Sequence, residues 1–237
     1  MKDIILHPKN RFTWTFLAFQ GGFVNTGGLI TVHVFVSHVT GFATHFSLEA
    51  HSQNFLRALY FLLVPCFFLM GAFATSLFAE LRKRQKKEAV YLFVLLILSM
   101  AYSSIALLGE MNFFGSFGEP FSSFRDFVLL SILAFSCGAQ NALFTHYSGS
   151  ILRTTHLTGL TTDLGIGLAK TLVTQNPSER YVNRIRVDLI LSFVFGSFGA
   201  AVVFGKLQFL GFLIPAGISL LVGLRLFQTR KQIQNEA

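Results

Sequence analysis

The hydrophobic pattern of the chain consists of long apolar segments separated by shorter polar stretches. The six apolar segments cover residues 13–36, 57–79, 89–109, 127–149, 187–205 and 207–227. An α-helix needs roughly 20 apolar residues to cross a hydrocarbon layer of about 30 Å, because each residue adds only about 1.5 Å. The segments are continuously apolar and too long for barrel strands, so each one predicts a transmembrane helix.

The composition supports the same class of protein. Apolar residues make up 52% of the 237-residue chain and charged residues only 13%, whereas about a quarter of a typical soluble domain is charged. Phenylalanine alone supplies 29 residues, which is more than a soluble domain of this length buries. We therefore expect a single all-α integral membrane domain over residues 1–237, with the lipid bilayer around it.

Basic residues predict how this domain is oriented in the membrane. The strongest cluster of positive charge is the stretch 81–88. Placing it in the cytoplasm, and alternating the spans outward from it, also places both termini and the stretch 150–186 there. These regions hold 16 of the 19 Lys and Arg residues, in keeping with the positive charge of cytoplasmic loops. Orientation thus accounts for the formal charge of +8, and no nucleic-acid partner is expected.

Motifs for enzymatic chemistry are missing from the sequence. Cys66 and Cys137 lie in apolar runs, without a Cys-x-x-Cys partner or zinc-ligand spacing. The stretch 165–170 is rich in glycine but lacks the rest of a phosphate-loop fingerprint. No His-Glu-x-x-His or nucleophile-elbow pattern occurs. The sequence therefore names no catalytic residue, no metal site and no cofactor.

Three matches in the same order along the chain indicate an internal duplication. The matching stretches are 22–25 with 138–141, 37–46 with 155–164, and 71–74 with 196–199. The middle pair shares the pattern (Ser/Thr)-His-(Val/Leu)-Thr-Gly. The duplication predicts one repeat at about 12–109 and a second at about 127–227. Each repeat holds three spans, and an odd number makes the copies antiparallel, as in the inverted repeats of many secondary transporters.

Inverted-repeat transporters bind their solute near the bilayer midplane, on interrupted helices. The glycine-rich stretches 21–28 and 138–149 predict such interruptions in the first and fourth spans. The segments 37–52 and 153–169 are too polar to cross the membrane alone. We expect each to fold back into the protein as a loop and a half-helix, because irregular backbone at membrane depth must be buried or line a cavity.

The candidate solute-binding residues are the polar, glycine and histidine positions of these motifs. They are Asn25, His38, Thr40, Gly41, Thr44, Gln140, Asn141, Arg153, His156, Thr158, Gly159 and Thr162. Close helix packing is the alternative for the Thr-Gly positions, and interhelical hydrogen bonding is the alternative for the three amides. His38 and His156 would bind a metal, relay protons or cap helices. Arg153 would bind an anion or extend to lipid headgroups.

The signature of the second half resembles that of a known family. The residues 138–141, 153–162 and 164–165 resemble the second signature of the YoaK-like family. The resemblance implies a bacterial six-helix protein of the cytoplasmic (inner) membrane, in a family with no settled activity beyond an expected role as a permease. The family pattern has an acidic residue where Asn25 stands and an Asn where Phe42 stands. It thus implies that any coupling through that acidic residue is lost here.

Three functions remain open at this point. The first is transport of a small solute through a site at the repeat interface. The second is an interfacial membrane enzyme, in which Arg153, His156 and Asp163 act on a lipid-linked substrate. The third is a scaffold that pairs helices through small residues such as those at 196–200. A homodimer is compatible with each of them, because six helices form a thin wall around a transport path.

Overall fold

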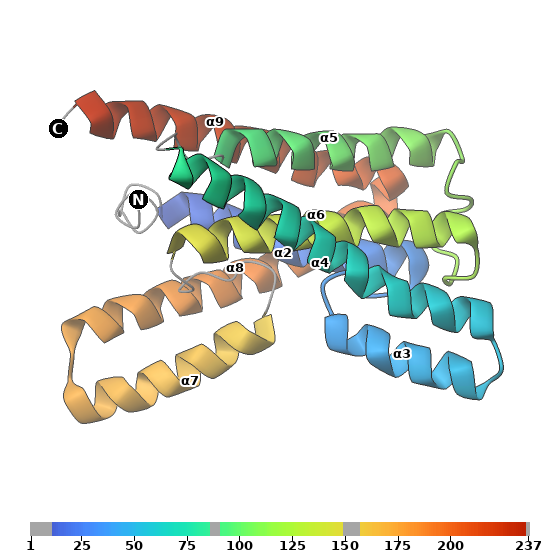
Figure 1. The fold of residues 1–237 in the computed structure, drawn as a ribbon, viewed down its shortest axis with the longest axis horizontal. Coiled ribbons are helices and arrows are strands. Elements are labelled where there is room, and N and C mark those ends of the chain that lie inside the picture. Colours follow the sequence, from blue (N-terminus) through green and yellow to red (C-terminus); the bar gives the residue numbers. More distant parts are fainter. Residues whose placement is uncertain (1–10, 86–90, 149–156, 236–237) are drawn as a thin grey trace.

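The computed structural model describes residues 11–85, 91–148 and 157–235, and it is built from helices joined by short connections (Figure 1). The helices are α2 (Arg11–Val32), α3 (Val39–His51), α4 (Phe55–Arg84), α5 (Tyr91–Glu110), α6 (Phe124–Ser148), α7 (Leu157–Thr174), α8 (Pro177–Leu207), the 3-10 helix η2 (Gln208–Phe212) and α9 (Leu213–Asn235). The described residues contain no β-strand. The predicted all-α class is therefore confirmed.

Four stretches of the described chain are long and apolar enough to cross a membrane. They are Phe55–Arg84, Tyr91–Glu110, Phe124–His146 and Pro177–Thr229. The last of these contains α8, η2 and α9, and so it includes the fifth and sixth predicted spans. The first predicted span, which lies in α2, is not among them. The chain is thus a helical protein of membrane-like composition, and the count of six spans stays a prediction.

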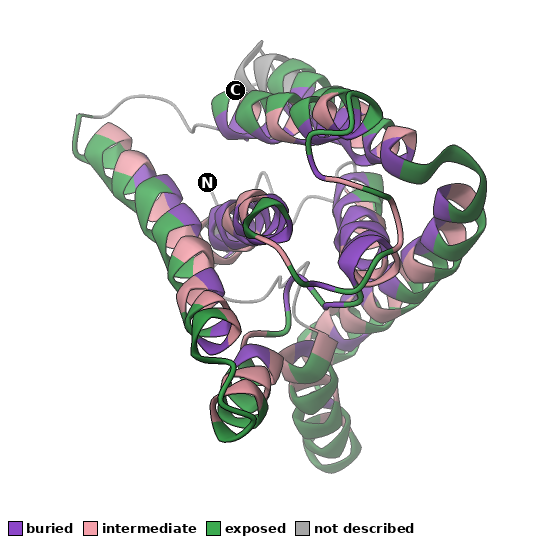
Figure 2. Cartoon of the chain, turned by 90° about the vertical axis from the view of Figure 1, so that its right-hand side faces the viewer, coloured by how far each residue is buried: buried purple, intermediate pink, exposed green. Residues whose placement is uncertain are grey.

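Helix α2 packs against protein on most sides. Its neighbours are α8, α9, α6 and η2. More than half of its residues are buried, including Thr13, Gln20 and Thr31. In Figure 2, buried residues lie on the sides of the outer helices that face the middle of the molecule, and exposed residues lie on their outward sides. α2 is buried along most of its length, although Phe12 and Phe16 near its start are exposed.

The predicted interruptions of the first and fourth spans are wrong. α2 is continuous to Val32, and α6 is continuous through Gly138 and Gln140. The chain leaves the first span only at His33, whose φ of 58° ends the helix. Pro177 begins α8, and the Asn176 side chain caps this helix. Within α2 and α6 the glycines that predict interruptions form packing surfaces instead.

Two pairs of helices approach each other at backbone distance. A Cβ atom added to Gly22 of α2 would meet the carbonyl oxygen of Phe193 in α8, and one added to Gly196 of α8 would meet that of Phe19 in α2. α4 and α6 contact each other in the same reciprocal way. A Cβ atom added to Gly71 would meet the carbonyl oxygen of Phe135, and one added to Gly138 would meet that of Phe68. Each helix thus contributes a Phe-x-x-Gly segment whose glycine faces the partner's backbone.

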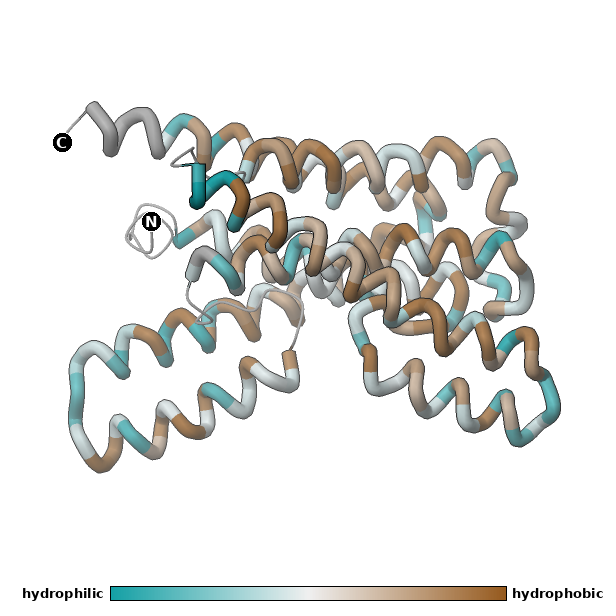
Figure 3. Tube along the Cα trace, in the orientation of Figure 1, coloured by the Kyte–Doolittle hydropathy of each residue, from teal (hydrophilic) through white to brown (hydrophobic). Residues whose placement is uncertain are grey.

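The two glycine-packed pairs lie on either side of the molecule's centre, and α5 and α9 pack along each other beside them. α2, α5 and α8 run in one direction in Figure 1, and α4, α6 and α9 run in the opposite direction. In Figure 3, hydrophobic residues follow the middles of these helices, whereas hydrophilic residues gather at the α3–α4 and α7–α8 turns and at the end of α4. α3 and α7 themselves are mixed in character.

The glycine contacts predict a sharp difference between two substitutions in α8. Gly196→Ala should destabilise the protein by about 1–3 kcal/mol, because the new methyl group meets a backbone carbonyl that cannot rotate away. Gly205→Ala is the matched control, since a Cβ there has nothing within 4 Å. It should be neutral or slightly stabilising. Thermal unfolding of both variants in detergent measures the difference, and equal melting temperatures would contradict the proposed role of the contact.

Candidate functional site

The site begins where the chain leaves α2. Residues 33–38 form an irregular connection between α2 and α3, and the Asn25 side chain holds it. Asn25 Oδ1 accepts hydrogen bonds from the backbone N–H of Val36 (3.2 Å), the backbone N–H of Ser37 (3.1 Å) and the Ser37 hydroxyl (3.1 Å). These bonds satisfy backbone donors that no helix or strand would otherwise pair. Asn25 is therefore a structural requirement of the connection.

A cavity of about 360 Å³ opens beside this connection. Its lining residues are Asn25, Phe35, Ser37, His38, Val39, Thr40, Leu157, Thr158 and Phe193. They come from α2, the connection, the first residues of α3, the first described residues of α7, and α8. In Figure 1 these ends of α3 and α7 lie near the middle of the molecule, and the two helices run outward from there in opposite directions. The volume lies in the usual range for small-molecule sites, about 300–1,000 Å³.

The lining offers hydrogen-bond donors in several places. Thr40 and Thr158 hydroxyls form no hydrogen bond with the described residues. His38 precedes α3 and its side chain makes no capping bond, so the imidazole and the N–H groups at the start of α3 are available as well. Phe35 packs against the His38 ring, with 6.0 Å between ring centroids. Phe193 of α8 adds a second aromatic side chain to the cavity lining. The cavity therefore combines polar groups with aromatic walls.

Several predicted site residues lie away from this cavity. The exposed Thr44 and Thr162 sit one helical turn further along α3 and α7. Their hydroxyls donate to the carbonyls of Thr40 and Thr158, at 3.4 and 3.1 Å. Gly41 and Gly159 are partly buried and do not line the cavity; a Cβ on Gly41 would come within 2.7 Å of His38 Nδ1. In each half of the chain, the first threonine of the motif thus lines the cavity and the second threonine does not.

The amides in the fourth span also lie elsewhere. Gln140 is buried and donates to the Leu17 carbonyl at 3.0 Å, while its Oε1 accepts from Gln20 at 2.9 Å. This outcome agrees with the interhelical hydrogen bonding that was the alternative for this residue. Asn141 Oδ1 is buried without a hydrogen bond to the described part of the chain, and Asn141 does not line the cavity. Arg153 and His156 lie outside the described residues, so the enzymatic alternative stays untested.

Sequence reasoning missed a buried polar cluster at the centre of the bundle. Gln20 of α2 donates to Gln140 of α6 and to the Ser219 hydroxyl of α9, both at 2.9 Å. Ser219 in turn donates to Gln20 Oε1 at 3.2 Å. A glutamine in the middle of an apolar helix must find hydrogen-bond partners, so the position of Gln20 in the sequence was the signal that could have indicated this cluster. Ser37 was also missed, although it begins the repeated (Ser/Thr)-His motif. Phe35 and Phe193 were missed because nothing in their sequence context separates them from ordinary span residues.

α3 and α7 are fastened to the long helices that follow them, α4 and α8. Phe42 of α3 packs near Phe61 of α4, and Glu49 of α3 forms an ion pair with Arg57 of α4 at 3.2 Å. Arg57 also lies over the rings of Phe61 and Phe121, about 6 Å from each centroid. α3 is therefore held along its length, although only its first residues face the cavity.

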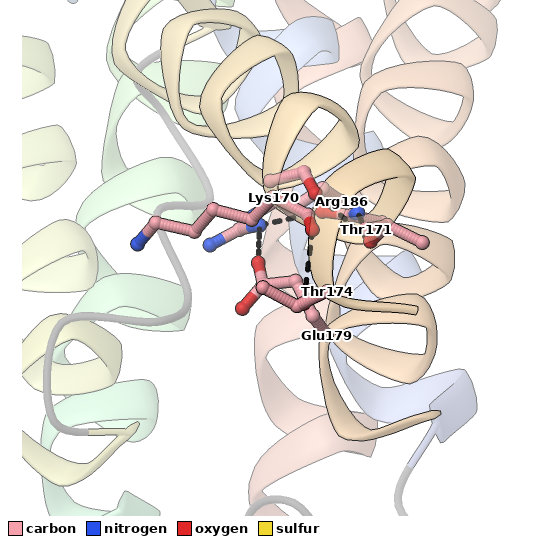
Figure 4. A network of polar contacts seen from close by, with 7 residues as sticks. Lys170, Thr171, Thr174, Glu179 and Arg186 are labelled. Carbon is pink, nitrogen blue, oxygen red and sulfur yellow. Dashed lines mark hydrogen bonds and ion pairs between the residues drawn. The ribbon is translucent and has the colours of Figure 1, made fainter. Parts of the chain in front are cut away.

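A polar cluster fastens α7 to α8 (Figure 4). Asn183 Nδ2 donates to the Thr171 hydroxyl at 3.0 Å, which connects the two helices. Arg186 Nη1 donates to Asn183 Oδ1 at 2.6 Å and to Glu179 Oε1 at 2.9 Å. Gly167 makes room for this cluster, because a Cβ there would meet Asn183, Arg186 and Glu179. Asp188, further along α8, instead pairs with Arg11 of α2 at 2.6 Å.

The described residues contain no group of three or more His, Cys, Asp or Glu side chains that could hold a metal ion. His38 lies in the cavity lining and His156 lies outside the described residues, so the predicted histidine pair stays untested. His38 is the one titratable side chain among the described lining residues.

The fold and the cavity define an all-helical protein with helices suited to a membrane and a polar cavity among them. The chain belongs to the family described as protein of unknown function (DUF1275), which it matches over residues 13–224. This assignment agrees with the resemblance to the YoaK-like family. Searches of curated proteins and of solved structures found no match.

The Gly167 environment predicts a local effect on α7. Gly167→Ala should loosen α7 from α8, because the methyl group displaces the side chains of Asn183 and Arg186. Amide hydrogen exchange within 157–174 should then become faster. Gly165→Ala, two residues away with nothing within 4 Å of its Cβ, is the control and should leave exchange unchanged. Equal exchange in the two variants would show that the cluster does not fasten the helix.

Proposed function

We propose that this protein is a carrier that moves a small polar solute across the bacterial cytoplasmic membrane, with the cavity at Thr40 and Thr158 as its binding site. The observation that carries the proposal is that the two motif segments, more than 100 residues apart in the sequence, line one cavity. The same cavity combines uncommitted polar groups with aromatic walls, as small-molecule sites do.

The helix packing supports a mechanism of alternating access. One unit consists of α2 and α8 with α7 on α8, and the other consists of α4 and α6 with α3 on α4. Asn25, Thr158 and Phe193 belong to the first unit, and Thr40 belongs to the second. Because the glycine contacts make each pair of long helices rigid, the units are suited to rock against each other. Such a movement would open the cavity to one side of the membrane and then to the other.

Two inverted repeats account for this arrangement. Each pair, α2 with α8 and α4 with α6, joins one helix of the first repeat to one helix of the second. A two-fold axis in the membrane plane that relates the repeats would convert one pair into the other. The Phe-x-x-Gly contacts correspond between the halves, since Gly22 matches Gly138 and Gly71 matches Gly196 in the predicted duplication. Under this proposal the helices α2, α4, α5, α6, α8 and α9 are the six spans, and α3 and α7 are half-helices.

Transport is tested with isosteric substitutions in purified protein reconstituted into liposomes. A flux screen over a panel of small polar solutes should identify a substrate. Thr40→Val and Thr158→Val should then each lower its flux about tenfold or more, because they remove a hydroxyl from the cavity and keep its shape. Thr44→Val and Thr162→Val, one turn further along, should leave flux near the wild-type level. No flux across the panel, or equal effects of all four substitutions, would refute the proposal.

The orientation proposed for the chain has a separate test. In a background with Cys66→Ala and Cys137→Ala, a cysteine at the exposed position Glu119 should react in intact cells with a membrane-impermeant maleimide. A cysteine at the exposed position Arg180 should react only after the membrane is opened, because the 150–186 stretch is expected in the cytoplasm. The reverse pattern would contradict the proposed orientation. Labelling of both positions in intact cells would contradict the span count.

A further inference from the structure

The orientation of the Asn25 amide limits what the cavity can bind. Three hydrogen bonds end on Asn25 Oδ1, from Val36 N–H, Ser37 N–H and the Ser37 hydroxyl. They identify the oxygen side of the amide, because an NH₂ group could not accept them. Asn25 Nδ2 makes no hydrogen bond with the described residues. The group that Asn25 offers to a solute is therefore a pair of fixed N–H donors.

The rest of the lining adds donors and no negative charge. Thr40 and Thr158 each provide a hydroxyl, which can donate. The lining contains no Asp or Glu and no Lys or Arg among the described residues. An ammonium solute would therefore find no ionised acceptor, whereas a carboxylate would meet donors from both units. The charge on such a solute would make the hydrogen bonds shorter and stronger than those to a neutral group.

The apolar side of the cavity limits the rest of the solute. Phe35 lines it from the connection, and Phe193 lines it from α8. Val39 and Leu157 add aliphatic surface at the starts of α3 and α7. A solute with a single charged end and an apolar body fits this division, because a second charge would have to lose its water against aromatic and aliphatic side chains.

We infer that the cavity binds a small monocarboxylate, with the carboxylate at Asn25 Nδ2 and the Thr40 and Thr158 hydroxyls and the apolar body against Phe35 and Phe193. This inference rests on the proposed carrier function and names its substrate class. Asn25 has two roles in it: its oxygen holds the connection before α3, and its nitrogen binds the solute.

The test compares probes that share a skeleton and differ in charge. Benzoate, benzamide and benzylammonium form one set, and acetate, acetamide and ethylammonium form a smaller one. Binding to the purified full chain is measured by calorimetry in detergent, in a buffer without carboxylates. At least one carboxylate should bind, and it should bind more tightly than its amide and ammonium partners. Tighter binding of an amide or ammonium probe, or no binding of either carboxylate, would overturn the inference.

Asn25→Asp provides the decisive variant. Its Oδ1 still accepts the bonds from Val36 and Ser37, while the second oxygen replaces the N–H donors with negative charge. Carboxylate affinity should fall about 10- to 100-fold, with the melting temperature preserved. Asn112→Asp, in the exposed loop after α5, adds the same charge outside the cavity and should leave affinity unchanged. Unchanged affinity in Asn25→Asp would overturn the inference.

The outcomes also separate the substrate class from the carrier function. Flux of a cationic or neutral solute that depends on Thr40 and Thr158 would refute the carboxylate and leave the carrier intact. Carboxylate binding in calorimetry without flux in liposomes would support the site and refute the carrier. Absence of both flux and binding would refute both.

Discussion

The close approach of helix backbones at four Phe-x-x-Gly segments is the constraint on which the rest of the structure depends. Helices in a bilayer gain little from the hydrophobic effect when they associate, so contact area and backbone proximity must supply the stability. A glycine that faces a partner's carbonyl lets two helices pack without intervening side chains and brings Cα–H groups close to the carbonyl oxygen. The contacts are reciprocal, and each therefore fixes both the distance and the register of a helix pair.

This packing explains why polar residues are concentrated at the centre of an otherwise apolar chain. Gln20 of α2 and Gln140 of α6 are buried, and they satisfy each other there through a hydrogen bond. At the end of α2 the chain forms an irregular connection, and the backbone N–H groups of Val36 and Ser37 donate to Asn25. The irregular backbone beside the cavity thus depends on a side chain of the preceding helix for its hydrogen bonds.

α3 and α7 both reach the cavity with their first residues but are fastened by different chemistry. The outer part of α3 is tied to α4 by the ion pair between Glu49 and Arg57. The outer part of α7 is tied to α8 by hydrogen bonds that lead from Thr171 to Asn183 and Arg186. Under the proposed carrier mechanism, each of these helices moves together with the long helix to which it is tied.

The apolar runs alone determined that this chain forms helices of membrane-like composition, because run length and continuity are properties of the sequence. The matches between the halves also located the glycines that pack the long helices, although their role was mistaken for interruption. Only the tertiary structure decided which polar residues share a cavity. Thr40 and Thr44 look equivalent in sequence, but α3 runs outward along α4, so only its first turn reaches the cavity. Likewise, no sequence pattern tells that the Asn25 oxygen binds the connection before α3, since that follows from where the connection places its backbone donors.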